Sequence, residues 1–218
     1  MIKPHTPNCT FKKLIEIFST ADQIALEEFY HSLEYAYYFG IVTEQDEDLY
    51  LATVYSEVGS DLEPTRENLN YSCSALKSTF SYYSASPSEA DADGRCGDHE
   101  ADQVTIGNKA YGNRLGNGSV ESGDGYEFRG GCYIQVTGRY NYQSIVAEIN
   151  EKVEKTYSPE FLADNSTEPF VASLGSMGWW AINNVGDCES MDEVTNIVNL
   201  HTESRDERNE TYAWIATL

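Results

Sequence analysis

Apolar side chains recur three or four positions apart near both ends of the 218-residue chain, and this spacing constrains the fold more than any other feature. Between residues 10 and 40 the spacing predicts two short amphipathic helices. Farther along it predicts helices over residues 140–153, 169–182, 191–200 and 207–218. We therefore expect a mainly α fold.

One predicted helix carries a candidate catalytic residue. Thr43 is a suitable N-cap, acidic residues occupy the positive end of the helix dipole, residues 49–55 are largely apolar, and Gly59 is a typical stop. Glu57 lies near the end of this helix. The negative end of the dipole and desolvation both favour the protonated form of a carboxyl group there, as a general acid requires. The alternative is a solvated glutamate at a helix end.

The middle of the chain is predicted to form loops. Residues 81–131 are rich in Ser, Asp, Asn and Gly, and residues 101–111 form their only strong helical run. Residues 126–136 alternate weakly, which predicts a short strand as a minor β element. Because we find no internal repeat, linker or low-complexity tail, we expect a single catalytic domain over residues 1–218.

Charge and hydropathy limit the possible partners. The chain has 14 Lys and Arg residues against 36 Asp and Glu, a net charge of -22, which argues against nucleic acid as a partner. The same charge repels other acidic polymers, so binding to one has to come from a cleft. The chain shows neither a secretory h-region nor an apolar run that could span a membrane. We expect a soluble protein with no membrane insertion.

The five cysteines are odd in number and widely spaced, with no C-x-x-C pair, so we expect buried or free thiols and no disulfide framework. Two metal motifs are weak. Residues 89–100 have the acidic spacing of an EF-hand loop, but Glu89 stands where Asp is usual and Cys96 occupies position eight. Cys96-x-x-His99 has no second pair to complete a zinc site. We expect no metal and no cofactor, with calcium binding as an open alternative.

Five segments carry a family resemblance through their order and spacing. They are residues 56–59 (SEVG), 67–72 (ENLNYS), 111–118 (YGNRLGNG), 122–125 (SGDG) and 128–142 (FRGGCYIQVTGRYNY). Together they resemble glycoside hydrolase family nineteen, in particular the chitinase-like lysozymes of phages and prophages. The resemblance runs from about residue 49 to the end, whereas residues 1–42 match weakly. It implies a lysozyme-like fold with two helical lobes flanking a glycan-binding cleft.

The resemblance also implies an inverting hydrolase with two catalytic carboxylates. Glu57 matches the general acid, and Glu67 matches the general base that activates water. An inverting pair needs roughly 6.5–9.5 Å between its carboxyl groups. The alternative for Glu67 is a loop residue paired with Arg66 or Arg129, and Glu121 is a reserve candidate for the base.

Further positions match residues that line the family's substrate groove, where amides and hydroxyls can bind amino sugars. They are Gln135, Thr137, Tyr140, Asn141, Asn199 and Arg208. Thr137 or a neighbour could also hold the attacking water. The alternative is ordinary surface polarity on helices, above all for Arg208.

Three departures from the family pattern bear on activity more than on fold. Ser56 replaces the His before the acid, Gly131 replaces the second Arg of R-G-R-G, and Leu200-His201 replaces a Gly-Gly pair. Each can weaken the positioning of the site without touching the two carboxylates. A catalytically silent glycan-binding or virion protein is therefore one alternative.

The leading hypothesis is a peptidoglycan muramidase, and a chitinase is its nearest rival. A chitinase that acts outside the cell normally needs a signal peptide, which this sequence lacks. We therefore expect a monomeric endolysin that is made in the host bacterial cytoplasm and acts on peptidoglycan glycan strands after release to the cell wall.

Overall fold

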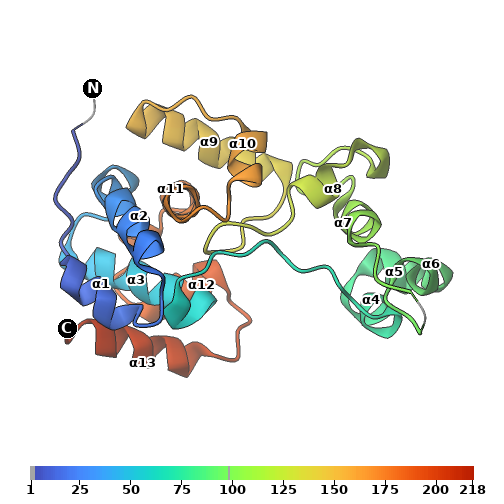
Figure 1. The fold of residues 1–218 in the computed structure, drawn as a ribbon, viewed down its shortest axis with the longest axis horizontal. Coiled ribbons are helices and arrows are strands. Elements are labelled where there is room, and N and C mark those ends of the chain that lie inside the picture. Colours follow the sequence, from blue (N-terminus) through green and yellow to red (C-terminus); the bar gives the residue numbers. More distant parts are fainter. Residues whose placement is uncertain (1–2, 98) are drawn as a thin grey trace.

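The computed structural model describes residues 3–97 and 99–218 and consists mainly of helices arranged in two lobes (Figure 1). The larger lobe contains α1 (Phe11–Ile17), α2 (Gln23–Leu33), α3 (Glu44–Val58), α9 (Arg139–Val153), α10 (Pro159–Asp164), α11 (Pro169–Ile182), α12 (Met191–Val198) and α13 (Arg205–Ile215). The smaller lobe contains α4 (Cys73–Thr79), α5 (Ser81–Ala85), α6 (Pro87–Asp93), α7 (Gln103–Tyr111) and α8 (Asp124–Glu127). The expectation of a mainly α, two-lobed fold is confirmed.

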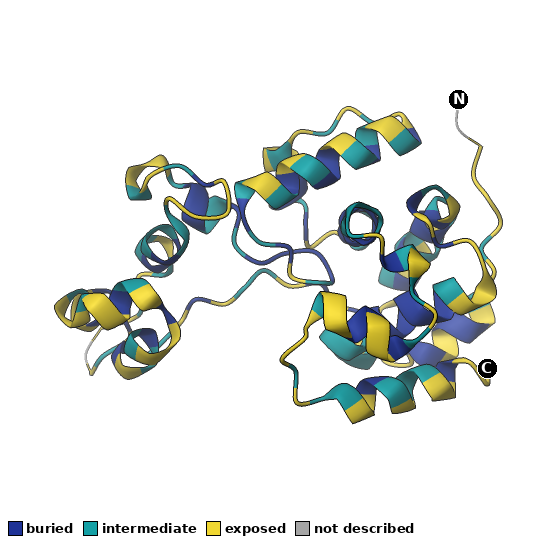
Figure 2. Cartoon of the chain, turned by 180° about the vertical axis from the view of Figure 1, so that it is seen from behind, coloured by how far each residue is buried: buried dark blue, intermediate teal, exposed yellow. Residues whose placement is uncertain are grey.

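The larger lobe is built around α11, which Figure 1 shows end-on between its neighbours. Helices α2 and α9 pack against it, and α13 packs against α3. Trp180 of α11 is fully buried and meets Tyr50 of α3 edge to face. Gly178 allows close packing with α9, since a Cβ there would lie 2.9 Å from a methyl carbon of Ile145. Figure 2 shows the buried helix faces turned toward this interior.

Helix α3 forms as its sequence predicts. Thr43 Oγ1 accepts a hydrogen bond from the backbone N–H of Asp46, and Asp46 accepts one from the backbone N–H of Thr43, a complete capping box. The apolar body of the helix is buried, and the helix ends at Gly59, whose φ of 76° suits glycine. Glu57 is thereby fixed in the last turn of α3.

The smaller lobe has its own apolar core and is more helical than expected. The core residues are Leu69, Leu76, Phe80, Tyr83, Ala90, Ile106 and Ala110. The prediction of loops from residue 81 was wrong over α5 and α6, because helices of five and seven residues are too short to show a clear apolar period. The strand predicted over residues 126–136 was also wrong, since the range begins in α8 and its only β feature is one isolated bridge between Gly131 and Val136.

The acidic stretch at residues 89–100 does not have the geometry of a calcium loop. Its first half is the helix α6, and residue 98 lies outside the described residues. Lys109 binds Glu89 at 2.7 Å and Asp93 at 2.6 Å, and Lys77 binds Asp91 at 2.6 Å. These carboxylates are therefore already paired with lysines, and the arrangement does not support the calcium alternative.

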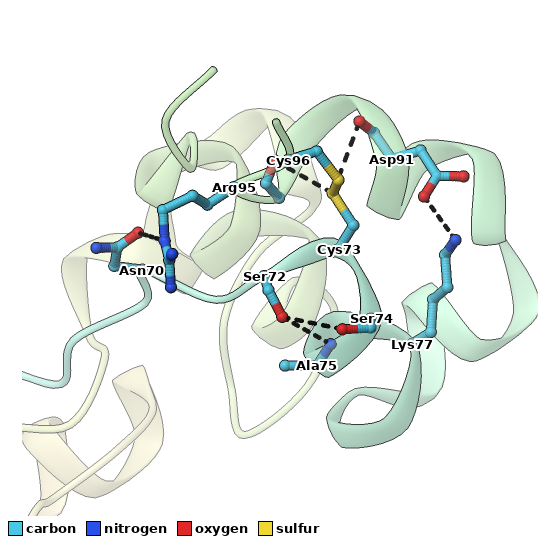
Figure 3. Close-up of a disulfide and its surroundings, with 10 residues drawn as sticks. Asn70, Ser72, Cys73, Ser74, Ala75, Lys77, Asp91, Arg95 and Cys96 are labelled. Atoms are coloured by element: carbon cyan, nitrogen blue, oxygen red, sulfur yellow. Dashed lines mark hydrogen bonds and ion pairs between the residues drawn. A yellow bond between two sulfur atoms is a disulfide. The ribbon is translucent and has the colours of Figure 1, made fainter. Parts of the chain in front are cut away.

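Cys73 and Cys96 form a disulfide in the smaller lobe (Figure 3). The expectation of free thiols was wrong for this pair, although Cys9, Cys132 and Cys188 are free. The two cysteines are 23 residues apart, and their Cα atoms lie 5.9 Å from one another. They meet because the chain returns past the start of α4 after α6, a contact that the spacing of cysteines along the sequence cannot show.

Two segments outside the helices connect the lobes (Figure 1): residues 62–72, which are largely extended, and residues 128–138, which form turns and bends. They pair where the backbone N–H of Glu67 donates to the carbonyl of Gly130 at 2.8 Å. Glu67 is thus held at the junction between the lobes. Among the described ranges, no helix combines the length and apolar character needed to cross a membrane.

Candidate active site

A cavity of about 790 Å³ opens beside the junction of the lobes. It is lined by Glu57, Thr65, Arg66, Glu67, Asn68, Gln103, Arg129 and Gln135. Both glutamates that the sequence singles out for catalysis lie on its wall, together with the predicted groove residue Gln135. The carboxylates come from different elements, since Glu57 ends α3 and Glu67 belongs to the connecting segment.

Glu57 is held by an ion pair with Arg208. Arg208 of α13 donates from Nη2 to Oε1 of Glu57. Arg208 is only 3% exposed. Nε and Nη1 of Arg208 are buried with no hydrogen-bond partner among the described residues. The apolar setting expected for Glu57 is therefore incomplete, because a guanidinium from the far end of the chain contacts its carboxylate directly.

A smaller cavity of about 190 Å³ lies next to this ion pair. Its lining includes Ser56, Arg208 and Glu207. Ser56, which replaces the expected His, donates its hydroxyl to the carbonyl of Ala52 at 2.7 Å within its own helix. The hydroxyl therefore bonds to the backbone of α3, and open volume remains beside it.

Glu67 is held by two neutral donors. Tyr111 donates its hydroxyl to Oε1 at 2.7 Å, and the backbone N–H of Gly130 donates to Oε2 at 3.3 Å. Burial and the hydrogen bond to Glu67 raise the pKa of Tyr111, so its phenol stays protonated. The alternative ion pair with Arg66 or Arg129 was wrong, because neither forms one with Glu67 in the part of the chain described.

Tyr111 was missed as a site residue by the sequence reasoning. It is the last residue of α7 and the first of the YGNRLGNG segment, so the segment itself was found. Its contact with Glu67 spans 44 residues of sequence and depends on how α7 packs against the connecting segment.

Arg66 supplies a guanidinium near the position where the family pattern has an Arg and this chain has Gly131. Its two terminal nitrogens donate to the carbonyls of Ala163 and Glu127. A Cβ on Gly131 would lie 2.7 Å from Oγ of Ser166, and that hydroxyl also donates to Ala163. The space beside Gly131 is therefore filled, and a large side chain at this position would require repacking.

Gln135 begins a short relay of hydrogen bonds away from the cavity. Its amide donates to the carbonyl of Thr65 at 3.0 Å. The hydroxyl of Thr137 donates to the carbonyl of Gln135 at 3.0 Å, and the amide of Asn141 donates to the carbonyl of Thr137 at 2.8 Å. Gln135 lines the cavity, whereas Thr137 and Asn141 do not.

Three other candidates do not line this cavity. Tyr140 is 65% exposed at the start of α9, and Asn199 is an exposed residue that follows α12. Glu121, the reserve base, lies in the 3-10 helix η3 (Val120–Ser122) and is exposed. A hydrogen bond from Ser119 lowers the pKa of Glu121, and the residue has no place on the wall that carries Glu57.

One group of potential metal ligands lies outside the cavity. The ligand atoms of Cys73, Asp91 and Cys96 lie within 4.8 Å of one another. The two sulfurs are bonded to each other, and the Asp91 carboxylate binds Lys77. These groups are therefore engaged with one another and with a lysine in this structure (Figure 3).

A comparison with known proteins identifies the family of the chain. A Haemophilus influenzae protein described as a glycosyl hydrolase family 19 domain-containing protein is 31% identical over 173 residues, which cover 79% of this chain and 80% of that protein. No family profile matches the chain. The lysozyme-like helical fold and the relative define a glycoside hydrolase. Within that class, the chain belongs to glycoside hydrolase family 19.

Proposed function

We propose that this glycosidase is a muramidase-type endolysin, which cleaves the β-1,4 bond between N-acetylmuramic acid and N-acetylglucosamine in bacterial peptidoglycan. The observation that carries the proposal is the presence of Glu57 and Glu67 on one cavity wall, each held by its own donors. The order of the sequence segments, which resembles the lysozymes of phages and prophages, supports the substrate.

The proposed reaction is a single displacement with inversion. Glu57 gives its proton to the glycosidic oxygen as the bond from that oxygen to the anomeric carbon breaks. A water molecule attacks the same carbon from the opposite face, and Glu67 accepts the proton of that water. Tyr111 and the N–H of Gly130 both donate to Glu67 and so hold its carboxylate in place.

The remaining cavity wall offers groups suited to amino sugars. Asn68, Gln103 and Gln135 bring side-chain amides to the cavity. An amide can both donate to and accept from the N-acetyl and hydroxyl groups of such a sugar. The proposed groove therefore binds the glycan by hydrogen bonds around the two carboxylates.

We further propose that the protein is made in the host bacterial cytoplasm and acts as a monomer on the wall after release. With a net charge of -22, long-range attraction to an anionic wall is absent, so binding depends on the cleft. Fractionation of a producing culture during lysis tests the proposed release to the wall. Activity confined to the cytosol would contradict that release.

The sharpest test of the activity compares the wild-type protein with Glu57→Gln on purified peptidoglycan. We expect zymogram clearing by the wild type and a loss of at least roughly 10²–10⁴-fold in the variant, because the amide keeps the shape but has no proton to give. Circular dichroism should show the same fold. A variant that keeps more than a tenth of the wild-type rate would refute the role of Glu57.

The products identify the bond. After borohydride reduction, mass spectrometry should find muramitol ends. Reduced N-acetylglucosamine ends, or digestion of chitin oligomers alone, would count against a muramidase and favour a chitinase. A clean wild-type protein that gives no clearing at any pH or salt concentration would favour the silent, glycan-binding alternative.

A further inference from the structure

One wall of the active-site cavity carries a guanidinium that forms no ion pair with a carboxylate of the described residues. Arg129 lines the cavity, and its Nη1 donates to the carbonyl of Tyr126 at 2.8 Å. The guanidinium carbon lies 3.8 Å from the centre of the Tyr126 ring. Within residues 3–97 and 99–218, Arg129 makes no ion pair, whereas Arg139 and Arg208 each bind a carboxylate.

A second cation reinforces this one. Arg66 lines the same cavity and donates to backbone carbonyls, and it likewise forms no ion pair within the described ranges. Burial and the proximity of Arg66 lower the pKa of Arg129, although an arginine remains charged at neutral pH. Two neighbouring cations in a partly buried wall repel each other, and an anion bound between or beside them relieves this cost.

The anions of the cavity itself do not fill that role. Glu57 pairs with Arg208, and Glu67 accepts from Tyr111 and the N–H of Gly130. The protein has a large excess of acidic residues, and Glu127 is near enough to favour the charged form of Arg129, yet no described carboxylate forms an ion pair with the Arg129 guanidinium. The guanidinium is therefore free to bind an anion that enters with the ligand.

We propose that Arg129 binds a carboxylate of the substrate and so selects peptidoglycan over chitin. The inference rests on the proposed function and extends it to substrate choice. Peptidoglycan carries carboxylates on each muramic acid unit, either on the lactyl group or on the peptide attached to it, whereas the repeating unit of chitin is neutral. A guanidinium recognises a carboxylate by two parallel hydrogen bonds, which a neutral sugar cannot match.

The test compares Arg129→Gln with the matched control Arg114→Gln. Arg114 also donates to a backbone carbonyl, that of Ala110, but it does not line the cavity. Each protein is assayed on intact peptidoglycan, on glycan strands stripped of peptide by an amidase, and on N-acetylglucosamine oligomers. For Arg129→Gln we expect kcat/KM to fall roughly tenfold on the wall substrates, with no change on the oligomers.

The substrate arms separate the two sources of the carboxylate. A loss on both wall substrates, the expected result, means that Arg129 binds a carboxylate from either source. A loss on intact peptidoglycan alone assigns the peptide carboxylate, and a loss on stripped strands alone assigns the lactyl carboxylate. An equal loss on all three substrates would mean that Arg129 acts on the fold or on the catalytic groups, and no loss would mean that it meets no anion. Either result overturns the inference.

A binding measurement keeps this test separate from the activity. In the Glu57→Gln background, calorimetry with a purified muropeptide and with a neutral oligomer of equal length gives both dissociation constants. We expect Arg129→Gln to raise the Kd for the muropeptide roughly tenfold and to leave that for the oligomer unchanged. If Glu57→Gln binds the muropeptide with the same Kd with and without Arg129→Gln, the inference is refuted even if the wild type digests walls. An inactive wild type refutes the proposed function whatever the binding shows.

Discussion

Arg208 of the last helix contacts the carboxylate of Glu57 directly, although 151 residues separate the two in the sequence. The side chain of Arg208 is 4% exposed and that of Glu57 is 19% exposed, so the pair is largely shielded from water. An ion pair with this little exposure fixes the direction of the Glu57 carboxyl, and α13 therefore belongs to the site as well as to the fold.

We predict that Arg208→Met lowers kcat by roughly ten- to a hundredfold and lowers the free energy of unfolding by about 2 kcal/mol, because Glu57 loses its partner in a partly buried place. Arg208→Lys should recover part of the loss, since it keeps the charge without the planar fork. The control is Arg205→Met. Arg205 lies on α13 like Arg208, and this change breaks an exposed ion pair with Asp192 of α12. Equal kinetics for Arg208→Met and Arg205→Met would contradict the positioning role.

A second prediction separates the two candidates for the base. Glu67→Gln should lose activity as severely as Glu57→Gln, whereas Glu121→Gln should retain it, because only Glu67 shares the cavity with Glu57. Azide should rescue Glu67→Ala, since a small anion can attack without losing a proton, and the glycosyl azide should have inverted configuration. Near-normal hydrolysis by Glu67→Ala, with loss in Glu121→Ala, would transfer the base to Glu121.

A third prediction concerns the hydroxyl of Tyr111. Tyr111→Phe removes a donor to the Glu67 carboxylate and keeps the ring, so we expect kcat to fall about tenfold with little change in KM. Tyr71→Phe is the control, since that hydroxyl forms no hydrogen bond with Glu67 among the described residues. An unchanged kcat in Tyr111→Phe, or an equal fall in Tyr71→Phe, would contradict the prediction.

A fourth prediction concerns the disulfide of the smaller lobe, whose apolar core is small. Cleavage by a thiol reductant should lower the free energy of unfolding by about 3 kcal/mol, because the link closes a loop of some two dozen residues. Thermal unfolding with and without reductant measures this. The double variant Cys73→Ala, Cys96→Ala should not respond to the reductant, whereas Cys188→Ser should respond as the wild type does. A response of the double variant would place the effect elsewhere.

The sequence alone determined features that depend on near neighbours. The capping box at Thr43, the apolar run after it and the stop at Gly59 are local signals, and together they placed Glu57 in the last turn of α3. The long helices α9 and α11 followed from apolar spacing for the same reason. The order of the family segments brought Glu67 and Gln135 into the hypothesis, and both line the cavity with Glu57.

The tertiary structure decided which groups contact these carboxylates. Arg208 meets Glu57 across 151 residues, Tyr111 meets Glu67 across 44, and Cys73 meets Cys96 across 23. Such contacts depend on how helices and connecting segments pack, and no spacing along the chain encodes them. The short helices α5 and α6 were missed for a related reason, because burial in the core of the smaller lobe stabilises them where the local pattern is weak.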